Sequence, residues 1–353
     1  MLKVVILGCG LISSKKHIPI FLKLGNKVKI VAICDLNLEL AKNAASKFGI
    51  EKFYSDYNQM LSSETPDIVV ICTPPQTHAK LTVQALESGA HVLLEKPMAL
   101  SVSDCDLMIE AANKYKKKLC IMHNQIFNPA FTKAKNLLLN GEIGEFIGAH
   151  LFLSTPSDYM TSIENHWAHK LPGGVLGETG PHSVYLLTSF LKDVYDVSVL
   201  AKKLLPVYPW SNFEDYRILL FAKNGFGSII QTYASNQWAS DLEIFGTTGI
   251  LKVDLQAKSV IKYNRSSLSP FPLGVSQLNG IVQQVVSLTS SSFNFILGKT
   301  WDAHSIGITQ FVDSILENKS FPVLGEHGRE NVEIVEMLVK KLKDYSNKAV
   351  VFK

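Results

Sequence analysis

The sequence predicts an α/β protein, with a doubly wound parallel sheet in a first domain and an α+β second domain built on a mainly antiparallel sheet. Through the first 125 residues, short apolar runs alternate with helix-like segments, which is typical of strands buried on both faces. Strand-like runs with few helices between them then recur over residues 146–254, and this favours an antiparallel sheet with one face to cover. We therefore expect two domains, 1–124 and 125–353.

A glycine-rich turn follows the first expected strand, 2–7. Gly8 permits a tight turn, and Gly10 lets the backbone approach a pyrophosphate at the start of the next helix, where free N–H groups attract an anion. The third small position of the turn is Ser13 instead of glycine, and its size still allows the helix to pack closely on the strand. The turn predicts a dinucleotide site, and an ordinary turn is the alternative. Its expected members are Gly8, Gly10, Leu11 and Ile12.

The second expected strand, 28–34, ends at Asp35. A carboxylate at this point accepts hydrogen bonds from both ribose hydroxyls of NAD and repels the 2′-phosphate of NADP. Leu36 and Asn37 follow, so no arginine stands there to pair with a phosphate. We expect NAD as the cofactor in preference to NADP. The alternative reading is that Asp35 only caps a helix.

Two further strands end at residues suited to the same site. The apolar run 68–72 leads into a stiff double-proline turn, and His78 begins the helix after it. The run 90–94 leads into Glu95-Lys96-Pro97. Ligands bind at the carboxyl ends of parallel strands, so we expect Lys96 to hydrogen-bond the reacting oxygen and stabilise its negative charge. A surface lysine is the alternative. The cofactor set is completed by Thr73, Pro74, Pro75, His78, Glu95, Lys96 and Asn124.

A second chemical cluster lies in the segment 173–182. Pro181 suits the first position of a helix that runs to about residue 191, which places His182 in the first turn. The positive end of the helix dipole disfavours a charged imidazole there, so a neutral His182 can take a proton from a hydroxyl. Glu178 is expected to orient this ring or to accept a substrate hydroxyl. The expected catalytic residues are Lys96, His182 and Glu178.

A loop with two histidines three residues apart precedes this cluster, at 166–170. Two histidines at this spacing do not by themselves make a ligand set, so we expect no metal. Tryptophan and histidine suit the apolar faces and the hydroxyls of a polyol, and a substrate-lining loop is the favoured interpretation. The expected substrate contacts are Lys96, Tyr159, Asn165, His166, Trp167, His169, His182 and Tyr185.

Composition excludes several classes of protein. Of the 353 residues, 46% are hydrophobic, which suits a compact protein, and the scattered net charge of +4 does not favour nucleic acid. Five cysteines form no CxxC pair, which indicates free thiols in a reducing compartment. No apolar stretch has the length of a membrane span, and residues 281–297 suit a covering or interface helix. We expect a cytoplasmic protein.

Together these motifs resemble the Gfo/Idh/MocA oxidoreductases, the family of glucose–fructose oxidoreductase and inositol dehydrogenase. The resemblance implies an N-terminal Rossmann domain and a C-terminal domain with a large open sheet, whose face often joins subunits into homodimers or homotetramers. It further implies that Lys96 contacts both cofactor and substrate and that His182 is the acid/base. Three departures stand out: Glu178 replaces the family's Asp, Ser13 replaces a glycine, and the segment 124–127 lacks an arginine that many members carry.

The sequence thus favours an NAD-dependent dehydrogenase or reductase acting on a sugar, a cyclitol or a sugar derivative. His182 would take the hydroxyl proton, Lys96 would hold the oxygen, and Glu178 would support one of them. Two alternatives stay open. One is a glycosidase or eliminase that oxidises its substrate only transiently with bound NAD, and the other is a ligand sensor that binds NAD without catalysis.

Overall fold

The computed structural model describes residues 1–264, 267–296 and 302–349, and these form two compact units. The first unit holds residues 1–124 and 302–333, and the second holds the described residues of 125–301 and 334–353. The expected limits, 1–124 and 125–353, put residues 302–333 in the second domain, whereas the contacts of this segment are with the first unit. Ile121 N donates to Val323 O at 3.2 Å, and Arg329 Nε donates to Asp106 Oδ1 at 2.6 Å.

The first unit is built on a six-stranded sheet in the order β3-β2-β1-β4-β5-β6, and every neighbouring pair is parallel. The order reverses between β1 and β4, so the predicted doubly wound sheet is confirmed. Such an order leaves a crevice for a ligand at the carboxyl ends of the central strands. The strands are β1 (Leu2–Leu7), β2 (Val28–Cys34), β3 (Phe53–Tyr54), β4 (Ile68–Ile71), β5 (His91–Glu95) and β6 (Leu119–Met122).

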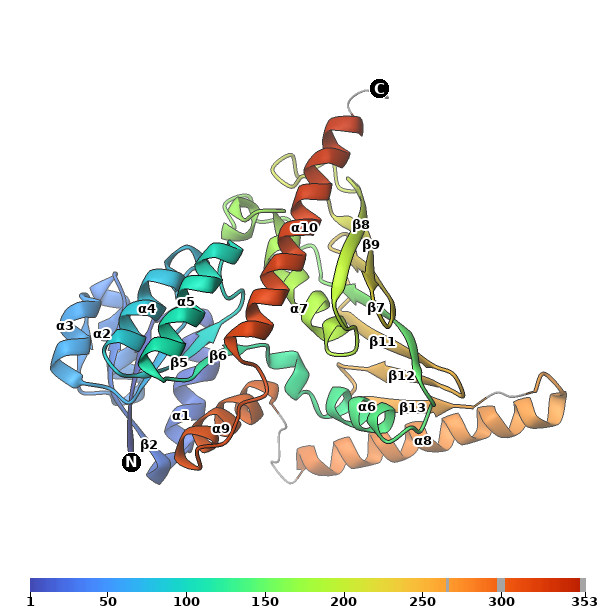
Figure 1. Ribbon diagram of the computed structural model, residues 1–353, viewed down its shortest axis with the longest axis horizontal. Helices are drawn as coiled ribbons and strands as arrows, with labels where there is room; N and C mark the ends of the chain where they lie inside the picture. Colours follow the sequence, from blue (N-terminus) through green and yellow to red (C-terminus); the bar gives the residue numbers. More distant parts are fainter. Residues whose placement is uncertain (265–266, 297–301, 350–353) are drawn as a thin grey trace. The chain divides into compact units, whose positions relative to one another are not determined.

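Helices connect these strands, and in doubly wound sheets right-handed crossovers put the connections of the two halves on opposite faces. In Figure 1, α4 and α5 lie side by side, and α1 contacts α9. A π-helical segment, Ser13–His17, precedes α1. The helices of this unit are α1 (Ile18–Lys23), α2 (Leu38–Phe48), α3 (Tyr57–Glu64), α4 (His78–Glu87), α5 (Val102–Tyr115) and α9 (Ala303–Leu316), and α10 (Gly325–Ala349) begins here.

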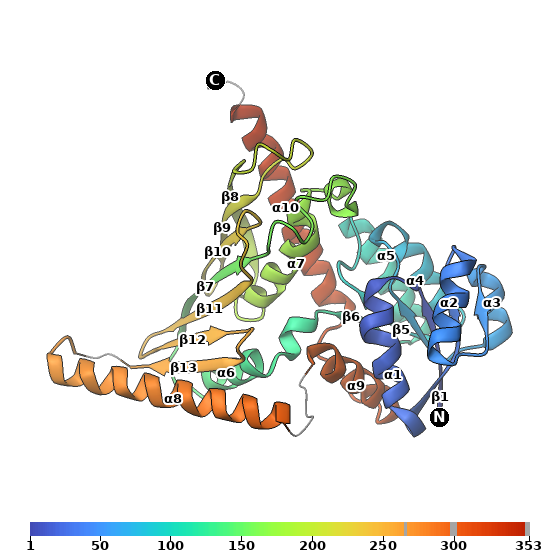
Figure 2. The ribbon, with the colours of Figure 1, turned by 180° about the vertical axis from the view of Figure 1, so that it is seen from behind.

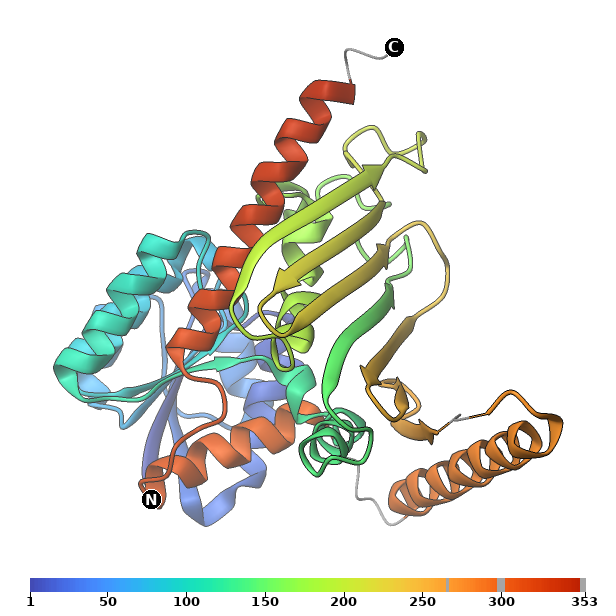
Figure 3. The same cartoon turned by 45° about the vertical axis from the view of Figure 1, so that its right-hand side comes forward.

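The second unit is built on a seven-stranded sheet in the order β13-β12-β11-β7-β10-β9-β8. All neighbours are antiparallel except β7 and β10, which run parallel. Figure 3 shows the strands side by side with α7 behind them. The mainly antiparallel sheet is confirmed. Its strands are β7 (Phe146–Ser154), β8 (Val194–Lys202), β9 (Asp215–Ala222), β10 (Gly225–Thr232), β11 (Ala239–Gly246), β12 (Ile250–Asp254) and β13 (Ser259–Tyr263).

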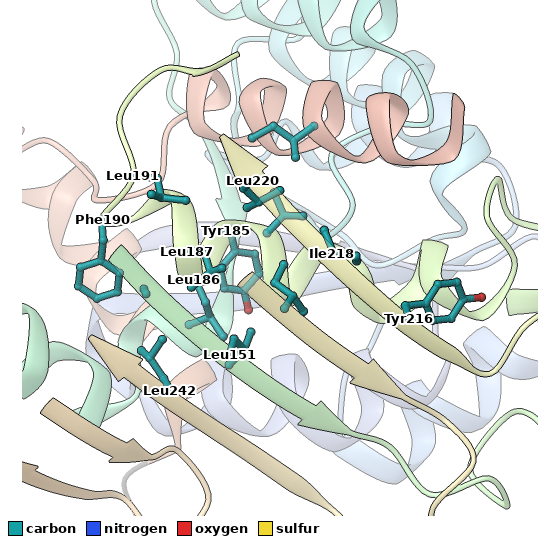
Figure 4. Close-up of a cluster of buried hydrophobic side chains, with 14 of the residues drawn as sticks. Leu151, Tyr185, Leu186, Leu187, Phe190, Leu191, Tyr216, Ile218, Leu220 and Leu242 are labelled. Atoms are coloured by element: carbon teal, nitrogen blue, oxygen red, sulfur yellow. The ribbon is translucent and has the colours of Figure 1, made fainter. Parts of the chain in front are cut away.

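One face of this sheet is covered by a buried apolar cluster, in which strand residues such as Leu220 and Leu242 meet Tyr185 and Leu187 of α7 (Figure 4). The helices of the unit are α6 (Pro129–Leu139), α7 (Val175–Thr188) and α8 (Pro270–Ile296), together with the end of α10. Helix α8 contacts β13, as Figure 2 also shows. Residue 297, the last of the predicted covering helix, lies outside the described residues.

The predicted start of the helix that carries His182 is wrong. Helix α7 begins at Val175 instead of Pro181, because Gly174, at φ 62° and ψ −134°, adopts a backbone conformation before the helix that suits glycine. Pro181 lies inside the helix, where it removes one backbone hydrogen bond, and burial of the helix on the sheet offsets that loss. His182 therefore lies about two turns into the helix, and Glu178 takes the first-turn position.

All five cysteines are free, as the sequence indicates. Burial, together with the nearby Asp35 carboxylate, raises the pKa of the Cys9 thiol to about 12 and that of Cys34 to about 11. Both thiols are therefore protonated and poorly nucleophilic at neutral pH. Over the described part of the chain, no helix is both long and apolar enough to cross a membrane.

Candidate active site

The turn after β1 has the shape that a pyrophosphate site needs. Gly8 has φ +85°, and a Cβ placed on it would lie 2.6 Å from the carbonyl oxygen of Cys72, so only glycine fits between the ends of β1 and β4. A Cβ on Gly10 would meet nothing within 4 Å, which leaves open space above the start of the helix. Ser13 is fully buried and its hydroxyl donates to Gly10 O at 3.2 Å. The residues present therefore fit a dinucleotide phosphate at a helix N-terminus.

Asp35 is held at the end of β2 by two backbone hydrogen bonds. Its Oδ2 accepts from Cys9 N at 2.8 Å, and its Oδ1 accepts from Asn37 N at 2.9 Å. The first bond ties the carboxylate to the glycine-rich turn, and each oxygen keeps a second lone pair for a ribose hydroxyl. Asn37 caps α2, since its side chain accepts from Glu39 N and Leu40 N. The helix-cap role considered for Asp35 thus belongs to Asn37.

His78 is buried between two loops at the carboxyl edge of the sheet and contacts both. Its Nε2 lies 2.8 Å from Thr73 O, and its Nδ1 lies 3.0 Å from Pro97 O. The ring thus links the turn after β4 to the segment after β5, which carries Lys96. Burial lowers the pKa of His78, although the backbone carbonyls at both nitrogens oppose this shift. Thr73 and Pro74 lie at the surface of this turn, and Pro75 is buried.

Glu95, the last residue of β5, is a buried carboxylate paired with histidines. Its Oε1 lies 2.7 Å from Nε2 of the fully buried His17 and 3.8 Å from Nε2 of His304, and its Oε2 accepts from Lys96 N at 3.2 Å. Burial acts to raise the pKa of Glu95, but the hydrogen bond and charge of His17, with the charges of His304 and Lys96, outweigh it and lower the pKa to about 2. Glu95 therefore points into the protein and anchors the backbone that carries Lys96.

This cluster continues outward through His304. Asn124 Nδ2 lies 3.5 Å from His304 Nδ1, and Asp302 Oδ1 lies 3.6 Å from the same nitrogen. Lys16 Nζ donates to Asp302 Oδ2 at 2.6 Å. The hydrogen bonds from His304 and Lys16 keep the pKa of Asp302 well below its usual range, even though partial burial opposes them. The path from Lys16 to Glu95 thus alternates basic and acidic groups.

In the second unit, a network of buried polar side chains fixes α7 against β10 and against Tyr233, which follows β10. Ser183 Oγ donates to Gln231 Oε1 at 2.8 Å, and Gln231 Nε2 donates to Thr179 Oγ1 at 2.7 Å. Tyr233, which is fully buried, hydrogen-bonds Thr179 as well. Thr179 and Ser183 lie on α7 beside the two residues expected to act chemically, so this network sets the rotation and height of the helix that presents them.

One ring nitrogen of His182 is held by Tyr185. Its Nδ1 lies 2.6 Å from Tyr185 Oη, and that hydroxyl also accepts from Gln125 N at 3.1 Å. The role expected of Glu178, to orient this ring or to accept a substrate hydroxyl, stays a prediction. Glu178 and His182 are both partly exposed, whereas Tyr185 is only 3% exposed.

In the loop before α7, both histidines contact backbone atoms of the loop itself. His166 Nδ1 accepts from Ala168 N at 3.2 Å, and His169 Nε2 lies 3.1 Å from Ile163 O. Among the described residues, no group of three or more His, Cys, Asp or Glu is placed to hold a metal ion. Trp167 is exposed, and Tyr159, also exposed, lies edge-on to Trp238 at 5.1 Å between ring centroids. Asn165 is exposed as well. The substrate roles of this loop stay predictions.

The sequence interpretation gave no site role to three residues of the cluster around Glu95, although His304 is among the residues that resemble the family. His17 lies in a helical segment that the sequence marks only as mostly apolar, and His304 and Asp302 reach the first unit from about two hundred residues beyond β5. Only a buried glutamate at a strand end, which needs a cationic or donor partner, gives a signal for them. That signal does not say which residues supply the partner.

Two family models cover most of the chain. The model described as "Oxidoreductase family, NAD-binding Rossmann fold" matches residues 2–123, and the model "GFO/IDH/MocA C-terminal domain" matches residues 131–252. The chain therefore belongs to the Gfo/Idh/MocA family of oxidoreductases, and its first unit is the NAD-binding Rossmann fold of that family. This confirms the resemblance and NAD as the cofactor class.

The chain is similar to individual proteins over part or most of its length. Inositol 2-dehydrogenase of Salmonella typhimurium is 33% identical over 165 residues, 45% of this chain and 49% of its own, so the match spans about half of that relative. An uncharacterised oxidoreductase of Bacillus subtilis is 26% identical over 92% of this chain and 89% of its own. The WlbA dehydrogenase of Bordetella pertussis, solved with NADH and UDP-GlcNAcA, superposes with a TM-score of 0.79 at 20% identity, covering 97% of this chain and 96% of its own. This last likeness concerns the fold alone.

The two turn glycines give a matched pair of substitutions. Gly8→Ala forces a Cβ against Cys72 O at a positive φ, so we expect it to lower the free energy of unfolding by about 2 kcal/mol or more. Gly10→Ala meets no protein atom, so we expect stability within about 0.5 kcal/mol of the parent chain but weaker NAD binding. Urea unfolding and a calorimetric NAD titration measure the two effects. Unchanged NAD affinity in Gly10→Ala would show that this turn does not hold the pyrophosphate.

The buried Glu95 predicts a pH dependence of stability. A carboxylate whose folded pKa lies near 2, against an ordinary 4.5, adds about 3 kcal/mol of stability above pH 4.5, and this is lost as the pH falls from 4.5 towards 2. We expect Glu95→Gln to be less stable than the parent chain at pH 7 and the difference to shrink on acidification. Unfolding curves at several pH values measure it. A constant difference between the two proteins would contradict the assignment.

Proposed function

We propose that the chain is an NAD-dependent dehydrogenase or reductase of a sugar, a cyclitol or a sugar derivative. The observation that carries the proposal is the placement of Lys96 directly after β5, at the edge where a doubly wound sheet binds its ligand. The relatives named inositol 2-dehydrogenase and D-glucoside 3-dehydrogenase support the substrate class. A homodimer or homotetramer formed through the second sheet, and a cytoplasmic location in keeping with five free thiols, complete the proposal.

The chain's own residues divide the work. When bound, the nicotinamide accepts or donates the hydride. Lys96 Nζ hydrogen-bonds the substrate oxygen and stabilises negative charge on it. His182 takes the hydroxyl proton during oxidation and returns one during reduction. Glu178, one methylene longer than the aspartate of the family pattern, hydrogen-bonds a substrate hydroxyl. Tyr159, Asn165, His166, Trp167 and His169 contact the remainder of the substrate.

The residues proposed to bind the cofactor hold and orient it. Gly8 and Gly10, with the N–H groups of Leu11 and Ile12, receive the pyrophosphate, and Asp35 receives the ribose. Thr73, Pro74 and Pro75 border the cofactor. The remaining members act indirectly, because their side chains bond other protein groups and thereby fix the loops around Lys96. They are Glu95, His78 and Asn124. Alignment of this kind lowers the entropic part of the barrier.

Nicotinamide absorbance over a panel of polyols, cyclitols and sugars tests this function. We expect NADH formation with at least one of them, and expect Lys96→Ala to lower kcat on the order of a hundredfold or more with little change in NAD affinity, because an ammonium that acts on the transition state is lost. Lys80→Ala, an exposed lysine of α4, is the matched control and should keep parental activity.

Other outcomes separate the alternatives. Turnover of a glycoside without net change in nicotinamide absorbance would replace the dehydrogenase by a glycosidase or eliminase with transient oxidation. NAD binding with ligand-dependent spectral change but no turnover would indicate a sensor. Parental activity in Lys96→Ala would remove this lysine from the mechanism.

A further inference from the structure

The hydrogen bond between His182 and Tyr185 points to a role for Tyr185 beyond the substrate contact that the sequence predicts. An imidazole that exchanges protons through one nitrogen needs its other nitrogen held, because a ring free to turn about its side-chain bonds spends little time in the productive orientation. In this chain the group at Nδ1 is the Tyr185 hydroxyl, at 2.6 Å.

Tyr185 is itself rigidly placed. Its ring belongs to the apolar core beneath α7 and is 3% exposed. Its hydroxyl accepts from the backbone N–H of Gln125, at 3.1 Å, where the chain enters the second unit. The two rings meet nearly edge-on, at 67° and 5.4 Å between centroids. The hydroxyl position is therefore fixed by core packing and by a backbone donor, and it defines where His182 Nδ1 must lie.

We propose that Tyr185 is the positioning residue that holds the His182 ring through Nδ1, so that proton exchange with the substrate takes place at Nε2. The proposal rests on the proposed function of His182. A hydroxyl oxygen has two acceptor sites, so it can accept from Gln125 N–H and from His182 Nδ1–H together. With Nδ1 protonated, Nε2 carries the lone pair that takes the substrate proton. The imidazolium formed by that transfer keeps the same Nδ1–H···Oη bond, so the bond need not break during the reaction.

A hydroxyl differs from a carboxylate in two ways that matter here. It carries no charge, so it adds no ion-pair stabilisation to the imidazolium. It can also donate to a bare Nδ1, and this stabilises the unproductive neutral form in which Nε2 holds the proton. Both forms of the ring therefore stay bonded to Tyr185, and the balance between them is a measurable property of the protein without substrate.

Tyr185→Phe tests the assignment, and Tyr216→Phe is its matched control. Both remove a hydroxyl from a tyrosine of the same buried cluster, as Figure 4 shows, but the hydroxyl of Tyr216 donates to Phe213 O at 3.0 Å instead. We expect the ring-nitrogen ¹⁵N shifts of His182, assigned with His182→Asn, to change in Tyr185→Phe and to stay parental in Tyr216→Phe. With a substrate, we expect Tyr185→Phe to lower kcat about tenfold with KM nearly unchanged.

The measurements distinguish a failure of the positioning role of Tyr185 from a failure of the proposed function. Parental ¹⁵N shifts and a parental pH profile in Tyr185→Phe would overturn the positioning role, whatever reaction the enzyme performs. Parental activity in His182→Ala would overturn the proposed function and would leave the ring-nitrogen result standing. A loss in Tyr216→Phe equal to that in Tyr185→Phe would show that the hydroxyl matters only for stability, and this also overturns the proposal.

Discussion

The buried carboxylate of Glu95 is the interaction on which the first unit's site depends. An unpaired carboxylate in this position would cost several kcal/mol. His17 Nε2 lies at hydrogen-bonding distance from Glu95 Oε1, 2.7 Å, and His304 Nε2 lies 3.8 Å away. One partner precedes α1 and the other begins α9, so the pair joins the first helix, the fifth strand and the returning segment 302–333 at a single point. Lys96 follows Glu95 directly, and its backbone position is set by that anchor.

In the second unit, neutral polar groups fix the position of α7 on its sheet. Gln231 and Tyr233 bond Thr179 and Ser183, so a fully buried amide and phenol hold α7 against the sheet. Burial of a satisfied neutral network costs less than burial of charge. The helix can therefore tolerate Pro181 in its interior and still present Glu178 and His182 at fixed positions.

Much of this architecture follows from local sequence rules. The glycine turn, the strand ends at Asp35 and Glu95, and the strand runs of both sheets all depend on neighbours in the chain, and they were predicted. The partners of Glu95 and the return of residues 302–333 depend on contacts across long separations, which periodicity does not encode. The start of α7 was mistaken because proline at a helix start is the commoner case, whereas here the positive φ of Gly174 decides it. Tyr185 was picked as a substrate contact, and only its buried ring and its bond to His182 point to another task.

The proposed chemistry requires that the ammonium and the imidazole act on one substrate oxygen, and a double-mutant cycle measures this most directly. Lys96→Ala, His182→Ala and the double variant are compared by kcat/KM with a substrate found by the panel. Groups that serve the same transition state give non-additive losses, so we expect the double variant to be scarcely slower than the slower single variant. Losses that add fully in free energy would show two independent roles and would contradict the shared site.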